Sequence, residues 1–145
     1  MADNTTTRNL ADILSNIDSP KEMEKFFKHP KVTDAHKDFI SYYRSLPSVT
    51  ELTDTEIIEK SGIEKSYYYQ IFKGTRHPSR DKILRLCIAA GLSVRETTRA
   101  LELSECATLY PKNRRDIIIT VGLNQKAHVM DINLLLDRYG EEALS

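Results

Sequence analysis

Five side chains in one short stretch carry groups that hydrogen-bond to the edges of nucleotide bases. They are Lys65, Ser66, Tyr67, Tyr69 and Gln70. A glutamine amide forms a bidentate pair with adenine and a lysine ammonium donates to guanine, and each good bidentate pair contributes about 1–3 kcal/mol of discrimination between bases. The hydroxyl groups of the serine and the two tyrosines can serve base edges or phosphates. This stretch is therefore the first candidate for a binding site.

These side chains need a helix that turns them outward from the rest of the chain. Tyr68, Ile71 and Phe72 fall at the i, i+3, i+4 spacing of a single apolar face. This spacing predicts a helix over residues 65–72 that packs through that face. For the tyrosines on either side of Tyr68 a second interpretation stays open, in which their rings complete the core and expose only the hydroxyl groups.

Cap and turn signals place another helix immediately before this one. Thr53-x-x-Glu56 is a capping box, in which each side chain satisfies the free backbone N–H of the other residue. It predicts a helix that continues to about Ser61. Gly62 follows at a position suited to a positive φ, so the two helices are expected to be joined by a tight turn.

The rest of the chain has helical periodicity and helix caps as well, so the expected fold class is all-α. The other predicted helices cover about residues 10–17, 20–28, 34–46, 80–90 and 94–103, with two more between 114 and 139. Thr33 is expected to cap the third of these helices, and Pro47 to end it. Ser93-x-x-Glu96 is a second capping box. Met1 to Thr7 is polar and is expected to be disordered.

Residues 53–92 resemble the lambda-repressor-like (Cro/XRE-type) helix-turn-helix family. The resemblance depends on apolar positions in three successive helices and on glycine and proline at the turns between them. These positions are Ile57, Ile58, Gly62, Ile63, Tyr68, Ile71, Gly74, Pro78, Ile83, Leu84, Leu86, Ala90, Gly91 and Leu92. The segments Tyr67–Gly74 and Leu109–Asp116 are in addition similar to segments of small bacterial regulator-like proteins.

The family resemblance implies a sequence-specific transcriptional regulator that binds double-stranded DNA. Its recognition helix, residues 65–72, is then expected to enter the major groove and to bring its polar side chains to the base edges. The family's loop meets the sugar–phosphate backbone at the positions of Lys73, Arg76 and His77. The free amides of the helix capped by Thr53 are expected to hold another phosphate. Because one such helix reads only a few base pairs, a dimer on a pseudo-palindromic site is expected.

Three regions follow from these elements. They are an N-terminal helical extension over residues 1–32, a lambda-repressor-like helix-turn-helix domain over 33–104, and a C-terminal helical hairpin over 105–145, packed on the core or forming a dimer seam. The extension is expected to bury Met23, Phe26 and Phe27. Residues 134–136 and Tyr139 are expected to seal the core or the dimer seam. Both end regions are candidates for homodimer pairing or for contact with a regulatory protein partner.

The net charge of the chain is zero, which by itself disfavours a general nucleic-acid binder. The charges are, however, unevenly distributed. Residues 63–85 contain six Lys and Arg against two Asp and Glu, whereas residues 1–62 contain 8 against 11 and residues 86–145 contain 7 against 8. A positive patch at the second helix and the turn after it suits phosphate contact, although a solvated helix face gives the same pattern.

A protein–protein adaptor is the alternative function. Asp54 stands where the family usually carries a glutamine that touches a phosphate, and DNA repels a carboxylate at that place. The zero net charge and the tyrosine-rich helix also suit a protein-binding surface, because tyrosine is enriched at such contacts. An adaptor of this kind keeps the helix-turn-helix scaffold and does not bind DNA.

Other functional classes have little support in the sequence. We find no glycine-rich phosphate loop and no Cys/His metal spacing, so no catalytic residue, cofactor or metal is expected and the chain is not expected to be an enzyme. Cys87 and Cys106 lie in apolar helical surroundings, which favours reduced core thiols in a cytoplasmic protein. No apolar run approaches the roughly 20 residues of a membrane span, and the N-terminus lacks a signal-peptide pattern.

A short pattern recurs near the C-terminus. Arg80-Asp81-x-Ile83 returns as Arg115-Asp116-x-Ile118, at an offset of 35 residues (80 to 115). A duplicated helical hairpin and chance similarity between helices both produce such a pattern. The arginines are expected to act as phosphate clamps or, as we favour, in caps and helix-to-helix ion pairs.

Overall fold

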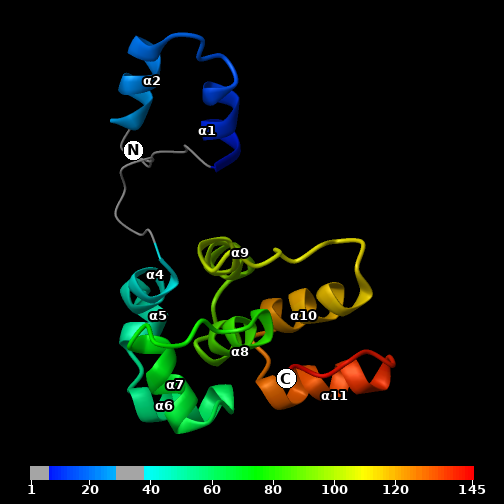
Figure 1. Cartoon of the computed structure of the whole chain (residues 1–145). Coiled ribbons are helices and arrows are strands. Elements are labelled where there is room, and N and C mark those ends of the chain that lie inside the picture. Colours follow the sequence, from blue (N-terminus) through cyan, green and yellow to red (C-terminus); the bar gives the residue numbers. More distant parts are fainter. Residues whose placement is uncertain (1–6, 29–37) are drawn as a thin grey trace. The chain divides into compact units, whose positions relative to one another are not determined.

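The computed structural model describes residues 7–28 and 38–145, and every regular element within these residues is a helix (Figure 1). The all-α fold class is thus confirmed for this part of the chain. The structure divides the chain into one unit over residues 1–37 and another over residues 38–145. The predicted boundary between residues 104 and 105 falls inside the second unit, and the predicted disorder of the first residues lies largely outside the described ones.

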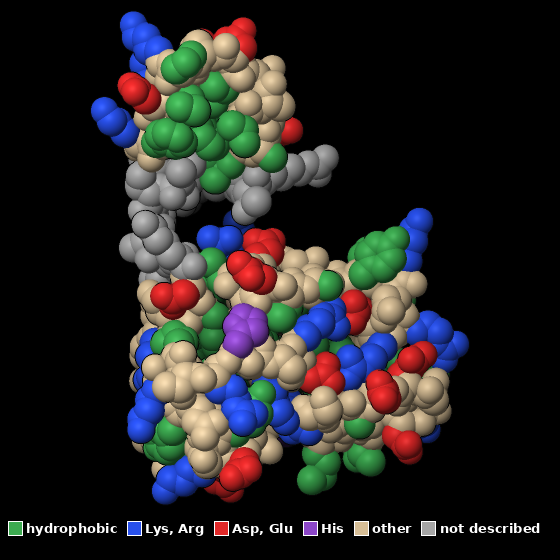
Figure 2. Space-filling view, viewed as in Figure 1, with side chains coloured by type: hydrophobic (Ala, Val, Ile, Leu, Met, Phe, Trp, Pro, Cys, Tyr) green, Lys and Arg blue, Asp and Glu red, His purple; other side chains and the backbone are tan. Residues whose placement is uncertain are grey.

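The first unit contains two short helices, α1 (Thr7–Leu14) and α2 (Pro20–Phe27). Ser19 caps α2, with its hydroxyl accepting from the N–H of Glu22 at 3.2 Å. The prediction that α2 buries its apolar side chains is wrong, because Met23 is 42% exposed and Phe27 is 56% exposed. Two eight-residue helices offer each other only one face, and hydrophobic side chains gather on the surface of this hairpin (Figure 2).

The second unit is built from helices whose starts follow local capping chemistry. They are α4 (Phe39–Ser45), α5 (Pro47–Thr50), α6 (Asp54–Ser61), α7 (Lys65–Phe72), α8 (Arg80–Ala89), α9 (Val94–Leu103), α10 (Arg114–Asn124) and α11 (Val129–Arg138). Both predicted capping boxes are confirmed. Asp38 caps α4, whereas the predicted cap at Thr33 lies outside the described residues. Pro47 ends α4 as predicted and also starts α5, since its fixed φ suits a first helical turn.

A single core joins all the helices of the second unit. At its centre the Tyr43 hydroxyl of α4 donates to the backbone oxygen of Leu86 in α8 at 2.8 Å. Burial raises the pKa of the Cys87 thiol to about 12, which keeps it protonated. Leu136 is buried as predicted, but Leu134 is 64% exposed and Tyr139 is 53% exposed, so these two do not seal the core. Leu134 lies in the middle of α11 on its outer face, and Tyr139 lies at the end of that helix.

The hairpins α8–α9 and α10–α11 repeat each other in detail. Adding 35 to the residue numbers of α9 gives the bounds of α11. The same offset relates Arg80, the first residue of α8, to Arg115, the second residue of α10. The left-handed backbone also recurs, at Gly91 and Lys126 between the helices and at Glu105 and Gly140 after them. A left-handed lysine or glutamate is uncommon, so its recurrence at the same offset indicates a duplicated hairpin.

Reciprocal ion pairs hold the two hairpins together. The guanidinium of Arg80 donates to both carboxylate oxygens of Asp116 at 3.1 and 3.0 Å, and Arg115 donates to both of Asp81 at 3.1 and 2.9 Å. In the same way α9 contacts α10 while α11 contacts α8. An approximate two-fold axis relates two elements that exchange partners like this. The prediction of helix-to-helix ion pairing is therefore confirmed.

Each arginine also binds the extended segment that follows the second helix of a hairpin. Arg80 donates to the backbone oxygens of Ala107 at 2.8 Å and Thr108 at 3.2 Å, while its partner Asp116 accepts from the N–H of Tyr110 at 2.9 Å. We call this arrangement the first clasp. It fixes the segment between α9 and α10.

The second clasp repeats these contacts at the end of the described chain. Arg115 donates to the backbone oxygens of Glu142 at 2.8 Å and Ala143 at 3.1 Å, and Asp81 accepts from the N–H of Ser145 at 3.0 Å. Burial raises the pKa of Asp81, but the hydrogen bonds from Arg115 and Ser145 outweigh it and hold the pKa below its usual value.

Candidate nucleic-acid interface

The start of α6 and the turn after it are fixed by groups of α6 itself and by Arg85 of α8. The Thr53 hydroxyl accepts from the N–H of Glu56 at 3.1 Å, which anchors the start of α6. Gly62 ends α6 with a φ of 67°. A Cβ on Gly62 would also lie only 2.9 Å from Nη1 of Arg85. The turn therefore needs glycine for its backbone conformation, and a Cβ there would also displace the end of the Arg85 side chain.

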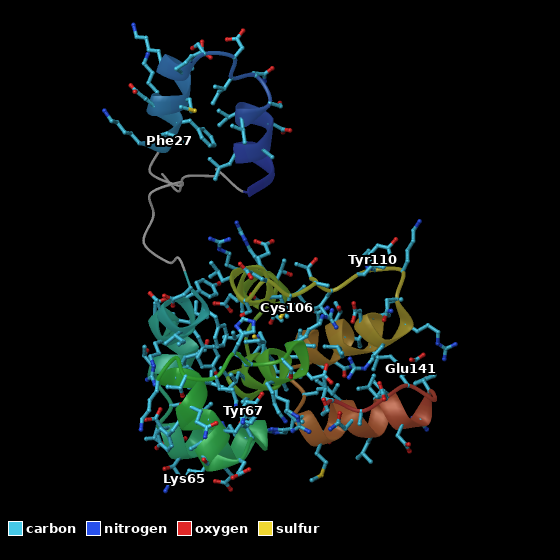
Figure 3. All side chains as sticks on the ribbon, in the orientation of Figure 1. Phe27, Lys65, Tyr67, Cys106, Tyr110 and Glu141 are labelled. Atoms are coloured by element: carbon cyan, nitrogen blue, oxygen red, sulfur yellow. The ribbon has the colours of Figure 1, made fainter. Side chains whose placement is uncertain are left out.

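α7 separates its apolar and polar side chains as its sequence predicts. Tyr68 and Ile71 are each only 1% exposed, and they pack α7 on the core. Of the predicted base-contacting residues, Lys65 and Ser66 are exposed, and the other three, Tyr67, Tyr69 and Gln70, are half-buried. Figure 3 shows Lys65 at the outer end of α7, pointing away from the unit.

The residues predicted to meet the DNA backbone are also accessible. Thr53 at the start of α6 and Lys73, Arg76 and His77 after α7 are all exposed. The polar side chains predicted to contact DNA between residues 65 and 77 are thus exposed or half-buried, and none of them is fully covered by the second unit. This accessibility is what a groove-reading helix requires, although a protein-binding surface requires it too.

Arg76 lies in the loop after α7 and contacts two side chains of that helix. Its guanidinium carbon lies 4.4 Å from the centroid of the Tyr67 ring, and its Nε donates to Oε1 of Gln70 at 2.9 Å. On α8, Nζ of Lys82 lies 5.4 Å from the same ring. Tyr67 therefore supports two cations, so its ring is neither a simple core residue nor a free groove contact.

This contact changes what Gln70 and Arg76 can do together. The amide oxygen of Gln70 has a second lone pair and its nitrogen has two donors, so the side chain keeps its capacity for bidentate pairing with adenine. Arg76 holds that amide in one orientation and still has its terminal nitrogens, whose fork matches the acceptors of guanine. Arg76 therefore lies with Gln70, one of the residues predicted to contact bases, although it was predicted to contact the DNA backbone.

Asp54 is turned toward the protein. The Tyr68 hydroxyl donates to Oδ1 of Asp54 at 2.7 Å, and Nη1 of Arg44 lies 4.0 Å from the same oxygen. Burial and the bond to Asp54 raise the pKa of Tyr68, so the phenol stays a donor. Arg44 also lies over the ring of Phe72, 4.5 Å from its centroid. These residues line a groove of about 470 Å³ at the start of α6, in which the charge of Asp54 is partly offset by Arg44.

Sequence reasoning missed two cations of this surface. Lys82 contributes to the positive surplus of residues 63–85, which was the only signal for it. Arg44 lies in a region with no such surplus, and only the packing of α4 on α7 brings it to Phe72 and Asp54.

Comparisons with known proteins add no assignment. No family model, no curated protein and no solved structure matches this chain. Within residues 7–28 and 38–145, no helix combines the length and apolar character that crossing a bilayer requires. Among the same residues, no three His, Cys, Asp or Glu side chains gather as a metal site.

Proposed function

We propose that this protein is a sequence-specific regulator of transcription that binds double-stranded DNA through a lambda-repressor-like (Cro/XRE-type) helix-turn-helix. α7 is its recognition helix in the major groove, and it acts without enzymatic activity, in the cytoplasm, as a homodimer. One observation carries the proposal. The polar side chains of residues 65–77 are accessible on a helix whose other face is locked in the core.

The arrangement around Gln70 supports base reading over a purely electrostatic contact. A helix that binds phosphates alone needs only positive charge, which Lys65 and Lys73 supply. The Gln70 amide, oriented by Arg76, which is itself stacked on Tyr67, is a pre-organised hydrogen-bonding group. Fixing such a group before binding lowers the entropic cost of ordering it in the complex.

Selection of duplexes from a random library tests the proposal, and two single substitutions separate the roles of the side chains. Gln70→Ala is expected to relax the preference at one position of the recovered sequence by about 1–3 kcal/mol. Lys73→Ala is expected to weaken binding on all sequences and to lower the slope of log affinity against log salt by about 1. Arg76→Ala is expected to resemble Gln70→Ala, because the two side chains form one unit.

Each substitution serves as the control for the other. Equal losses on selected and random duplexes for Gln70→Ala contradict base reading by this residue. A uniform loss for Arg76→Ala assigns Arg76 to the DNA backbone alone. A recovered sequence without two-fold symmetry contradicts binding as a dimer.

The adaptor function is kept as a second candidate because of Asp54. Its carboxylate remains at the first turn of α6, 45% exposed, where a phosphate is expected in the DNA complex. A mobility-shift titration across salt concentrations separates the two functions. Counterion release makes the affinity for DNA fall steeply with salt, whereas an adaptor shows no affinity for duplexes at any salt concentration.

A further inference from the structure

The outer side of α11 carries exposed apolar side chains. Met130 is 73% exposed and Leu134 is 64% exposed, and hydrophobic side chains project from this helix in Figure 2. The surface, which we call the α11 face, is formed by Met130, Asp131, Leu134, Leu135, Arg138 and Tyr139. Exposed apolar side chains that are contiguous and rimmed by charged ones mark surfaces that bind other proteins.

In the first hairpin the matching surface is covered by a helix. The offset of 35 residues makes α9 the counterpart of α11, and α4 packs on α9. Ala100 and Ser104 are buried there, whereas their counterparts Leu135 and Tyr139 are half-buried and exposed. This side of the hairpin is therefore suited to packing against a helix.

α4 runs antiparallel to α9 on that surface. Phe39, at the start of α4, lines one cavity together with Leu103 and Ser104 at the end of α9. Further along α4, burial and the nearby carboxylate of Glu96, in the first turn of α9, raise the pKa of Tyr42. The first hairpin thus indicates what kind of occupant the α11 face fits, namely an antiparallel helix.

The α11 face is complementary to itself in an antiparallel pair. Asp131 lies in the first turn of α11 and Arg138 in the last turn, and Leu134 and Leu135 lie midway between them. If two copies of α11 pair about a two-fold axis at that midpoint, each carboxylate meets the guanidinium of the other copy and the leucines meet each other. The helix dipole also favours these two charges at these ends, but it does not favour exposed leucines between them.

The outermost residues of the face agree with this register. Met130 and Tyr139 are equally far in sequence from the same midpoint, so the pairing brings the thioether of one copy to the ring of the other. Contacts between a methionine sulfur and an aromatic ring are favourable. In α9 the same register would pair Glu96 with Leu103. The self-complementary pattern therefore belongs to the hairpin whose face is exposed and not to the one that α4 covers.

We propose that two copies of this protein pair through the α11 face, with their α11 helices packed antiparallel about a two-fold axis. The inference rests on the homodimer of the proposed function and names its contact surface. A second copy is the occupant because a two-fold contact uses the same patch on both molecules, and this patch matches itself in charge and in apolar side chains. With six residues a side, against roughly 20–30 in a standard interface, the free dimer is expected to have a micromolar dissociation constant.

Sedimentation of the whole chain without DNA, from micromolar to millimolar concentration, tests the proposal. The wild type is expected to pass from monomer to dimer. Leu134→Asp is expected to weaken the association at least about tenfold, because it places two carboxylates at the centre of the apolar contact. Tyr110→Asp is the matched control. This residue is 57% exposed and lies between α9 and α10, away from α11 (Figure 3), so the variant is expected to pair as the wild type does.

Two charge reversals test the antiparallel register without touching the apolar side chains. Asp131→Arg and Arg138→Asp each place like charges opposite each other at both ends of the pair, so each variant alone is expected to associate at least about tenfold more weakly. An equimolar mixture is expected to regain the wild-type affinity, because each variant then supplies the charge that the other needs. Circular dichroism checks that every variant keeps its helices.

The possible failures are distinct from a failure of DNA binding. A wild type that stays monomeric at millimolar concentration overturns the proposal. A dimer that Leu134→Asp leaves intact overturns it as well, and the homodimer of the proposed function then pairs through another surface. A mixture of the charge variants that associates no better than each alone contradicts the antiparallel register. Duplex selection decides separately whether the protein binds DNA, so a pair that depends on Leu134 but has no affinity for DNA supports the α11 face and contradicts the proposed regulator.

Discussion

Replacing Asp116 with alanine is expected to lower the free energy of unfolding by about 3–5 kcal/mol. The Asp116 side chain is only 9% exposed, and it accepts two hydrogen bonds from Arg80 and one from the N–H of Tyr110. Its removal leaves the Arg80 guanidinium, whose side chain is 24% exposed, without a counter-charge, and a largely buried charge without a partner costs more than the pair itself contributes. Urea denaturation monitored by circular dichroism measures the loss.

An exposed ion pair provides the control for this substitution. Arg99 and Glu102 of α9 form a pair whose side chains are 44% and 36% exposed, so Arg99→Ala is expected to cost less than about 1 kcal/mol. The double substitution Arg80→Ala and Asp116→Ala is expected to recover part of the loss, because no unpaired charge remains. A loss below about 1 kcal/mol for Asp116→Ala contradicts the view that the clasps hold the hairpins together.

Gly122→Cys is expected to lower the free energy of unfolding by about 2–3 kcal/mol through overpacking. A Cβ at Gly122 would lie 2.5 Å from Cγ1 and 2.6 Å from Cδ1 of Ile132, so the Ile132 side chain or one of the two helices must shift. Position 122 corresponds to Cys87 in the first hairpin, and Ile132 corresponds to Thr97. The first hairpin thus fills this space with two side chains of intermediate size, whereas the second combines a glycine with the larger side chain of Ile132. Thermal and urea denaturation measure the change.

The first hairpin indicates which second substitution compensates for Gly122→Cys. Ile132→Thr alone removes buried apolar volume beside a glycine and is also expected to destabilise the protein. Combined with Gly122→Cys it restores the pair found at Cys87 and Thr97, so the double variant is expected to be more stable than either single variant. Additive losses in this cycle contradict the structural equivalence of the hairpins.

Sequence reasoning was most accurate where the governing interactions are local. The bounds predicted for α7 agree with the structure, and the boxes at Thr53 and Ser93 form as predicted. Gly62 has the expected positive φ. Capping and turn chemistry involve residues at most four positions apart, so their signals survive in a single sequence.

The interactions that shape the candidate site could not be read in the same way. The bond between Tyr68 and Asp54 spans 14 residues, and its geometry depends on how α6 and α7 pack. The exposure of Met23 in the first unit shows the same limitation, since periodicity identifies an apolar face without showing whether anything covers it. The clasps could be predicted in part from the sequence, because the Arg-Asp-x-Ile pattern that starts at Arg80 recurs at Arg115, at an offset of 35 residues. Extending that offset to Leu109 and Leu144 would have singled out the C-terminal segment.

The approximate two-fold axis between the hairpins has a consequence for refolding. The α10–α11 hairpin of one molecule offers a neighbouring molecule the same surface that it offers its own α8–α9 hairpin. The connection over residues 104–113, between α9 and α10, would serve as the hinge for such an exchange. Domain swapping is a low-cost route to dimers when a chain carries an element that fits its own copy. Refolding from denaturant at high protein concentration therefore favours swapped dimers, and dilute refolding favours the monomer.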